Sequence, residues 1–77
     1  MRRITYKGYI LEAHPHQLAD DSRWTLNITI SRHDGEQLIE QPFSAANLFD
    51  AEEDAVQHCI NFGRQIIDGQ VAGCTAP

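Results

Sequence analysis

Hydrophobic and polar positions between residues 50 and 69 repeat with the period of a helix. At about 100° per residue, the apolar side chains of this stretch fall within one half of a helical wheel. They are Ala51, Ala55, Val56, Cys59, Ile60, Phe62, Gly63, Ile66 and Ile67. Asp50 suits the N-cap, with Glu53 three residues on as in a capping box, and Gly69 suits the C′ position. The pattern predicts one amphipathic helix over residues 50–69.

The apolar stripe of this helix is wide. It spans about 180°, whereas packing against one surface needs an apolar stripe of only about 100°. Two interpretations are open: the whole stripe is core, or one of its edges meets a second chain. That edge consists of Val56, Ile60, Gly63 and Ile67, and we name these four as possible interface residues.

Alternating apolar and polar residues before the helix predict extended strands. The first β region covers residues 4–13, where Lys7-Gly8 either forms a hairpin turn or bulges one edge. The clearest alternation covers residues 24–32. Asp34-Gly35 is a turn signal before a third strand over residues 37–43. We expect residues 44–49 to cross over to the helix.

These elements predict an α+β fold, in which a three-stranded antiparallel meander carries one C-terminal helix on one face. Residues 1–70 form a single domain, and residues 71–77 are predicted to be a flexible tail because they show no periodicity. One helix covers one side of a sheet, so the other side is open. On that side we place Thr25, Asn27 and Thr29, a small uncharged row that adds to the possible interface. The open face and the free sheet edges favour a homodimer.

Charge limits the partners that we expect. The chain has 77 residues and a net charge of −5, which argues against general binding of nucleic acid. Arg2, Arg3 and Lys7 hold three of the six basic residues. A dimer that brings two such clusters together is the alternative by which the protein would contact DNA.

Cysteine usage and hydropathy bear on the compartment. Two cysteines do not make a disulfide framework, and we expect both thiols to be reduced. Met1-Arg2-Arg3 is not followed by an apolar run, so we expect no signal peptide. No stretch approaches the ~20 apolar residues of a membrane span. The expectation is a cytoplasmic protein.

No pattern in the sequence indicates a catalytic or metal site. His14 and His16 lie near Asp20 and Asp21, but no CxxC or HExxH spacing accompanies them. Cys59 falls in mid-helix on the apolar side, where nothing lowers a thiol pKa. There is no glycine-rich phosphate loop. We therefore expect a protein that is not an enzyme and has no cofactor and no metal.

Several landmarks resemble those of a family of short uncharacterised bacterial proteins of unknown function and, more distantly, of the HlyU-type transcriptional activators. The landmarks are Tyr6-Lys7-Gly8-Tyr9, Trp24, Asp34-Gly35-Glu36, Phe43, Phe49, Glu53-Asp54-Ala55, and the run from Gly63 to Gly69. The resemblance covers most of residues 6–70 and implies a shared fold. Residues 43–47 depart from the HlyU-type pattern, which tends to carry an arginine and an aspartate there.

The sequence thus predicts a small bacterial binding or interaction module. Its expected partner is a second copy of itself or another protein, with no membrane and no catalytic role. The alternative from a different class is a transcription-associated regulator that contacts DNA as a dimer through its basic N-terminus.

Overall fold

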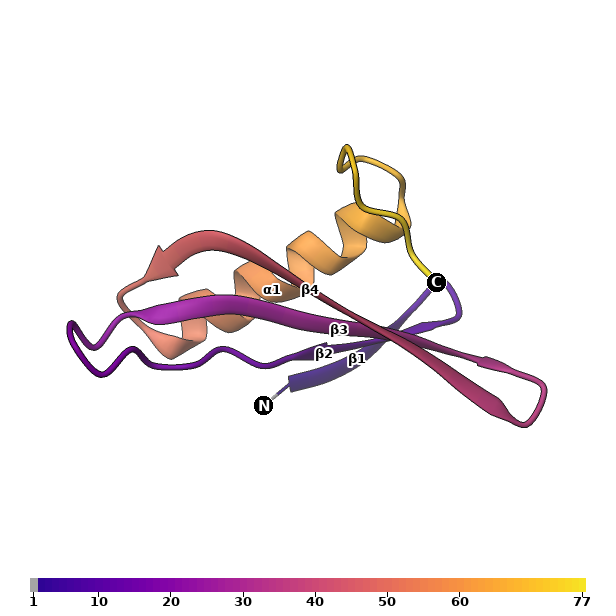
Figure 1. The fold of residues 1–77 in the computed structure, drawn as a ribbon, viewed down its shortest axis with the longest axis horizontal. Helices are drawn as coiled ribbons and strands as arrows, with labels where there is room; N and C mark the ends of the chain where they lie inside the picture. The colour runs from indigo at the N-terminus through magenta and orange to yellow at the C-terminus, as the bar shows by residue number, and fades with distance from the viewer. Residues whose placement is uncertain (1) are drawn as a thin grey trace.

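In the computed structural model, which describes residues 2–77, a four-stranded antiparallel sheet carries one helix on one face (Figure 1). The elements are β1 Arg2–Tyr6, β2 Tyr9–Ala13, β3 Trp24–Asp34, β4 Gln37–Phe49 and α1 Glu52–Ile67. The strands lie in the order β1-β2-β3-β4, which is a meander. The predicted α+β class, with an antiparallel sheet and a C-terminal helix, is confirmed. The predicted number of three strands is wrong.

The additional strand arises in the first β region, which folds back on itself as a hairpin. Tyr6 pairs with Tyr9 across the turn. Lys7 and Gly8 both have positive φ, at 50° and 84°. Positive φ at both central residues is the condition for a type I′ turn, whose twist matches that of the flanking strands. Of the two alternatives for Lys7-Gly8, the hairpin is the one that forms.

β4 is longer than the sequence predicts. Residues 44–49 do not cross over but remain in the strand, which pairs with β3 along its whole length. Ala45 pairs with Leu26 and Leu48 pairs with Thr25, so Ala46 and Asn47 are extra residues in β4. Such a bulge bends a strand and increases its local twist. The bend brings the chain from Phe49 directly into α1.

The two ends of α1 are built differently. Ala51, not the predicted Asp50, is the N-cap; it is extended at φ −123° and ψ 145° and makes no side-chain capping bond. At the other end, Gly69 has a φ of 75° and its N–H donates to Ile66 O at 3.1 Å. The N–H of the next residue donates to Gln65 O at 2.9 Å. These two bonds make a Schellman motif, so the predicted C′ role of Gly69 is confirmed.

The core lies between α1 and the middle of the sheet. Its buried apolar residues are Leu11, Ala13, Leu26, Ile28, Ile30, Ala55, Val56, Cys59, Ile60 and Ile66. Gly63 lets the helix approach closely, because a Cβ there would lie 3.1 Å from side-chain atoms of Leu11 and Ile28. This contact places the helix chiefly over β2 and β3.

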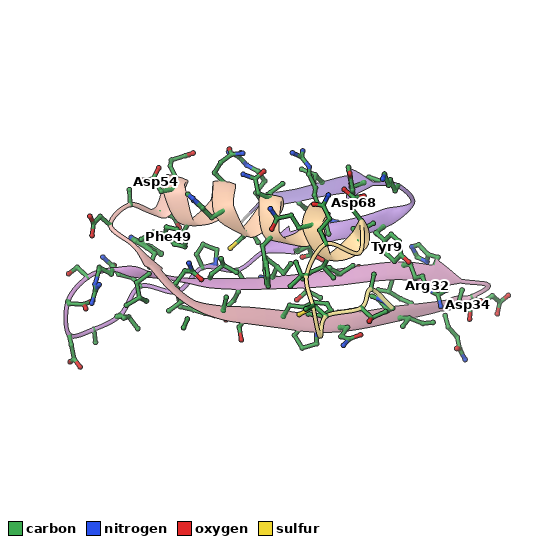
Figure 2. All side chains as sticks on the ribbon, turned by 90° about the horizontal axis from the view of Figure 1, so that it is seen from above. Tyr9, Arg32, Asp34, Phe49, Asp54 and Asp68 are labelled. Carbon is green, nitrogen blue, oxygen red and sulfur yellow. The ribbon has the colours of Figure 1, made fainter. Side chains whose placement is uncertain are left out.

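Residues after α1 fold back over the sheet (Figure 2). The main-chain oxygen of Pro77 accepts hydrogen bonds from Arg32 Nε at 2.8 Å and from the Tyr9 hydroxyl at 3.1 Å. Val71, Cys74 and Ala76 are partly buried against the core. These contacts argue against the predicted flexibility of residues 71–77, which a truncation can test.

Candidate interaction surface

The side of the sheet opposite α1 is uncovered, and we call it the open face. Directly paired residues of antiparallel strands point to the same side, so the register assigns each residue to a face. The open-face positions include Ile10 and Glu12 on β2, His14 just after it, Thr25, Asn27, Thr29 and Ser31 on β3, and Leu38, Glu40, Pro42, Ser44 and Leu48 on β4. The predicted assignment of Thr25, Asn27 and Thr29 to this face agrees with the register.

The middle of the open face is polar, uncharged and internally bonded. Asn27 Nδ2 donates to Thr25 Oγ1 at 2.6 Å, and the His16 N–H donates to the same hydroxyl oxygen at 3.0 Å. Ser31 is only 3% exposed although it lies on the uncovered side. Short side chains with satisfied hydrogen bonds are cheap to cover, because little polar surface is left without a partner.

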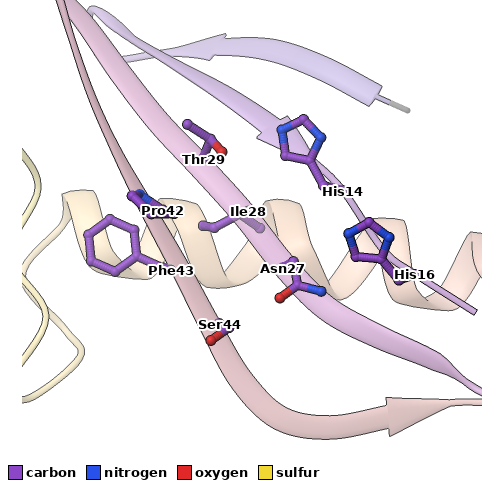
Figure 3. A pocket seen from close by; sticks show the side chains of 8 residues that line it. All are labelled: His14, His16, Asn27, Ile28, Thr29, Pro42, Phe43 and Ser44. Carbon is purple, nitrogen blue, oxygen red and sulfur yellow. The ribbon is translucent and has the colours of Figure 1, made fainter. Parts of the chain in front are cut away.

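A shallow hollow of about 400 Å³ lies at the centre of this face. Figure 3 shows it from the open side, with α1 behind the strands. Three segments line it: His14 and His16 after β2, Asn27, Ile28 and Thr29 on β3, and Pro42, Phe43 and Ser44 on β4. No carboxylate lines the hollow itself, although Glu12 lies at its rim, 4.0 Å from His14 Nε2.

Two exposed leucines flank this centre. Among residues 2–77, Leu38 at 48% and Leu48 at 36% are the large hydrophobic residues that remain exposed. Both lie on β4 at open-face positions, since Leu38 pairs with His33 and Leu48 pairs with Thr25. Neither was predicted as a surface residue from the sequence. The alternation of residues 37–43 could have placed Leu38, but Leu48 depends on the bulge at Ala46 and Asn47.

The edges of the sheet are poor sites for adding a strand. β4 is one edge, and Pro42 within it has no N–H to donate to a neighbour. The bulge at Ala46 and Asn47 further interrupts that edge. β1 is the other edge, and it is five residues long and begins with Arg2 and Arg3. Short, charged or proline-containing edges discourage pairing with another chain.

The edge of α1 that the sequence suggested as a possible interface is buried or partly buried within the single chain. Val56 is 7% exposed, Ile60 is 4% exposed, and Gly63 is also buried against the sheet. Ile67 is partly buried. The width of the apolar stripe is therefore used by the core of the single chain, which removes the reason for assigning this edge to a second chain.

A second hollow, of about 340 Å³, lies between α1 and β4. Its apolar part includes Phe49 and Phe62, and amide side chains of Asn47, Asn61 and Gln65 form its polar part. The Phe49 ring stacks on the imidazole of His58 at a centroid distance of 4.5 Å. That stacking joins the end of β4 to α1, so we interpret this hollow as part of the packing between the two elements.

Two of the three basic N-terminal residues have carboxylate partners on α1 or just after it. Arg2 lies 3.9 Å from Glu53. Lys7 donates to Asp68, which also accepts from the Tyr6 hydroxyl at 2.8 Å. These hydrogen bonds, of which the one from Lys7 has the larger effect, lower the pKa of Asp68 below its usual 3.8. The bond to Asp68 in turn raises the pKa of Lys7 above 10.5. Arg3 pairs in register with Glu12. The cluster is therefore partly neutralised by the chain itself.

Thiols and potential metal ligands are scattered over the described residues. Both cysteines are free thiols. Burial raises the pKa of the Cys59 thiol, and its hydrogen bond of 3.4 Å to Asn27 O opposes that effect. Across residues 2–77, no three His, Cys, Asp or Glu side chains lie close enough to share a metal ion.

The described part of the chain contains no helix that is both long enough and apolar enough to cross a membrane. Comparisons with protein-family models, curated proteins and solved structures find no match to this chain. The resemblance to HlyU-type proteins therefore stays a prediction, and function has to be argued from the open face.

Proposed function

We propose that this protein is a small non-catalytic interaction module of the bacterial cytoplasm, and that it works as a homodimer through its open face. The observation that carries the proposal is the position of Leu38 and Leu48. The two large exposed hydrophobic side chains flank one uncovered surface whose central row, on β3, is small and uncharged. Depletion of charge at the centre of a patch is typical of interfaces between proteins.

The size of the molecule supports this assignment. A standard interface buries about 800 Å² on each partner. That is roughly one sixth of the 4895 Å² accessible surface of one chain. In a fold of two layers, one uncovered sheet face can supply such an area. Because both edges of the sheet are poor pairing sites, the open face is a better contact surface than either edge.

The experiment is the solution mass, measured by size exclusion with light scattering at several micromolar, with and without reductant. We expect a dimer that persists in reductant and that is weakened by Thr29→Lys, which puts a charge into the centre of the face. Gln57→Lys is the matched control, because Gln57 is exposed on the outer side of α1. A monomer at all concentrations would contradict the proposal, and a dimer lost in reductant would assign the contact to Cys74.

The alternative that the protein contacts DNA through Arg2, Arg3 and Lys7 has a separate test. Phosphate-driven binding is strongest at low salt and falls as salt rises. Because the net charge is −5 and Arg2 and Lys7 have acidic neighbours, we expect no shift of random duplex DNA in a low-salt gel. A salt-sensitive shift that is lost in Arg3→Glu would favour the alternative.

A further inference from the structure

We infer that two copies pair open face to open face about a two-fold axis that lies between the sheets and crosses the strands at the level of Ile28. This inference rests on the proposed function and specifies how the second copy is oriented. A two-fold axis makes the contact self-complementary, so that if residue i meets j, then j also meets i. An axis across the strands reverses their direction and stacks each strand on its own counterpart.

The level of the axis follows from the register. Ile28 pairs with Phe43 and with Ala13, so these three residues lie in one row across the sheet. The axis sets an open-face residue one step to one side of this row over the residue one step to the other side in the second copy. On β3 the exchange sets Thr29 over Asn27 of the second copy, which matches a hydroxyl with an amide. Each group offers both a donor and an acceptor, so both can be satisfied when covered.

The same axis matches a carboxylate with an imidazole next to β2. Glu12 pairs with Thr29, and the His14 N–H donates to Asn27 O, so Glu12 and His14 lie on opposite sides of the axis. The carboxylate of Glu12 then meets the imidazole of His14 of the second copy, twice in the dimer. An axis one step away, at the level of Thr29, would place Glu12 over Glu12 of the second copy. Like charges at matching positions of an interface are costly, so the axis at Ile28 is favoured over the axis at Thr29.

On β4 the axis sets Leu48 near the end of the strand that carries Leu38 in the second copy. Leu48 lies at the level of Thr25, three residues from Ile28 along β3. Its counterpart position is the level of Ser31, where Glu40 lies and Leu38 follows. Leu48 therefore lies over Glu40 of the second copy, one open-face position away from Leu38.

Two single variants test the orientation. Thr29→Lys and Asn27→Glu each put one charge at the centre of the face, and each is expected to raise the homodimer Kd by about tenfold or more. When the two variants are mixed, the lysine introduced in one lies over the glutamate introduced in the other. We expect the mixed dimer to form with a Kd at least about tenfold lower than that of either variant alone. Native mass spectrometry of the mixture, with one variant isotopically labelled, counts the three dimers directly.

The outcomes separate the orientation from the proposed function. If the unmodified protein is a monomer, the proposed function itself fails. If it is a dimer but the mixed species forms only at the statistical ratio, the axis is wrong, because a parallel arrangement puts residue 29 over residue 29. If neither variant weakens the dimer, the open face is not the interface. Gln57→Lys mixed with Gln57→Glu controls for attraction between the net charges of two variants, and an equal preference in that mixture would also overturn the assignment.

Discussion

The two faces of β3 differ in kind although their residues alternate along one strand. On the covered face, Leu26, Ile28 and Ile30 are 0–5% exposed and fill the core under α1. On the open face, Thr25, Asn27 and Thr29 are partly exposed and carry no charge. Folding of the single chain depends on the first row and makes little use of the second. Stability and association can therefore be changed separately by substituting neighbouring residues.

The largest effect is expected from the pair Ile30→Ala and Thr29→Ala. Ile30 is fully buried, and its truncation should lower the free energy of unfolding by about 3–4 kcal/mol, through lost burial and a new cavity. Thr29→Ala, one residue away on the other face, should change it by no more than about 1 kcal/mol, the range of β propensity. Urea denaturation of both variants below the dimer Kd measures the difference. Equal losses would mean that the open face also contributes to the fold of the monomer.

Gly63→Val should come next, because it overfills the contact between α1 and the covered face. A Cβ at position 63 already lies 3.1 Å from Leu11 and Ile28, and valine adds two further carbons. Overpacking of this kind costs about 1–3 kcal/mol. Gly63→Ala is the graded control, since part of its steric cost is offset by about 0.5–1 kcal/mol of helix propensity. Thermal unfolding measures both, and an unchanged midpoint for valine would show that the helix can lift from the sheet without loss.

Removal of residues 71–77 should have a smaller effect. The segment contributes the hydrogen bonds of Arg32 and Tyr9 to Pro77 O and partial burial of Val71 and Ala76. We expect a loss of about 1–2 kcal/mol, or a midpoint lower by several degrees for a domain of this size. Arg32→Gln in the full chain should reproduce part of this loss. A midpoint that does not move in either variant would support the flexible tail predicted from the sequence.

The smallest effect is expected from Asp68→Asn, and it depends on pH. The folded pKa of Asp68 lies below its usual 3.8, so its contribution is present above that value and is lost as pH falls through the lower, folded pKa. The folded pKa of Lys7 lies above 10.5, so its contribution is present below that value and lost as pH rises further. The difference in midpoint between the unmodified protein and the Asp68→Asn variant should therefore be flat from about pH 5 to 9 and shrink at both extremes. A difference that peaks near neutral pH would assign the effect to another group.

The sequence predicts the covered face well and the open face only in part. Periodicity alone locates α1, and the alternation in β3 separates the buried row of Leu26, Ile28 and Ile30 from the open row. Burial governs both patterns, and burial leaves a strong signal in sequence. The hairpin at Lys7-Gly8 was one of two alternatives, because a glycine after a lysine fits either a turn or a bulge.

Other features depend on contacts that are distant in sequence. The pairing of Ser44 and Ala45 with β3 lengthens β4, and a strand that contains Pro42 gives little sign of continuing beyond it. Whether the wide apolar stripe of α1 is core or interface depends on how closely Gly63 lets the helix approach, which no wheel shows. The contacts of residues 71–77 involve Tyr9 and Arg32, far away in the chain, and the segment itself has no periodic pattern.

Pro42 and the bulge beside it also limit how this protein can assemble at high concentration. A sheet grows into a filament when the edge strand of one molecule templates the next through a continuous row of backbone donors and acceptors. β4, the longest strand here, offers a row that is missing one donor at Pro42 and is displaced at Ala46 and Asn47. Addition of a strand at β4 should therefore be weaker than at an uninterrupted edge of the same length.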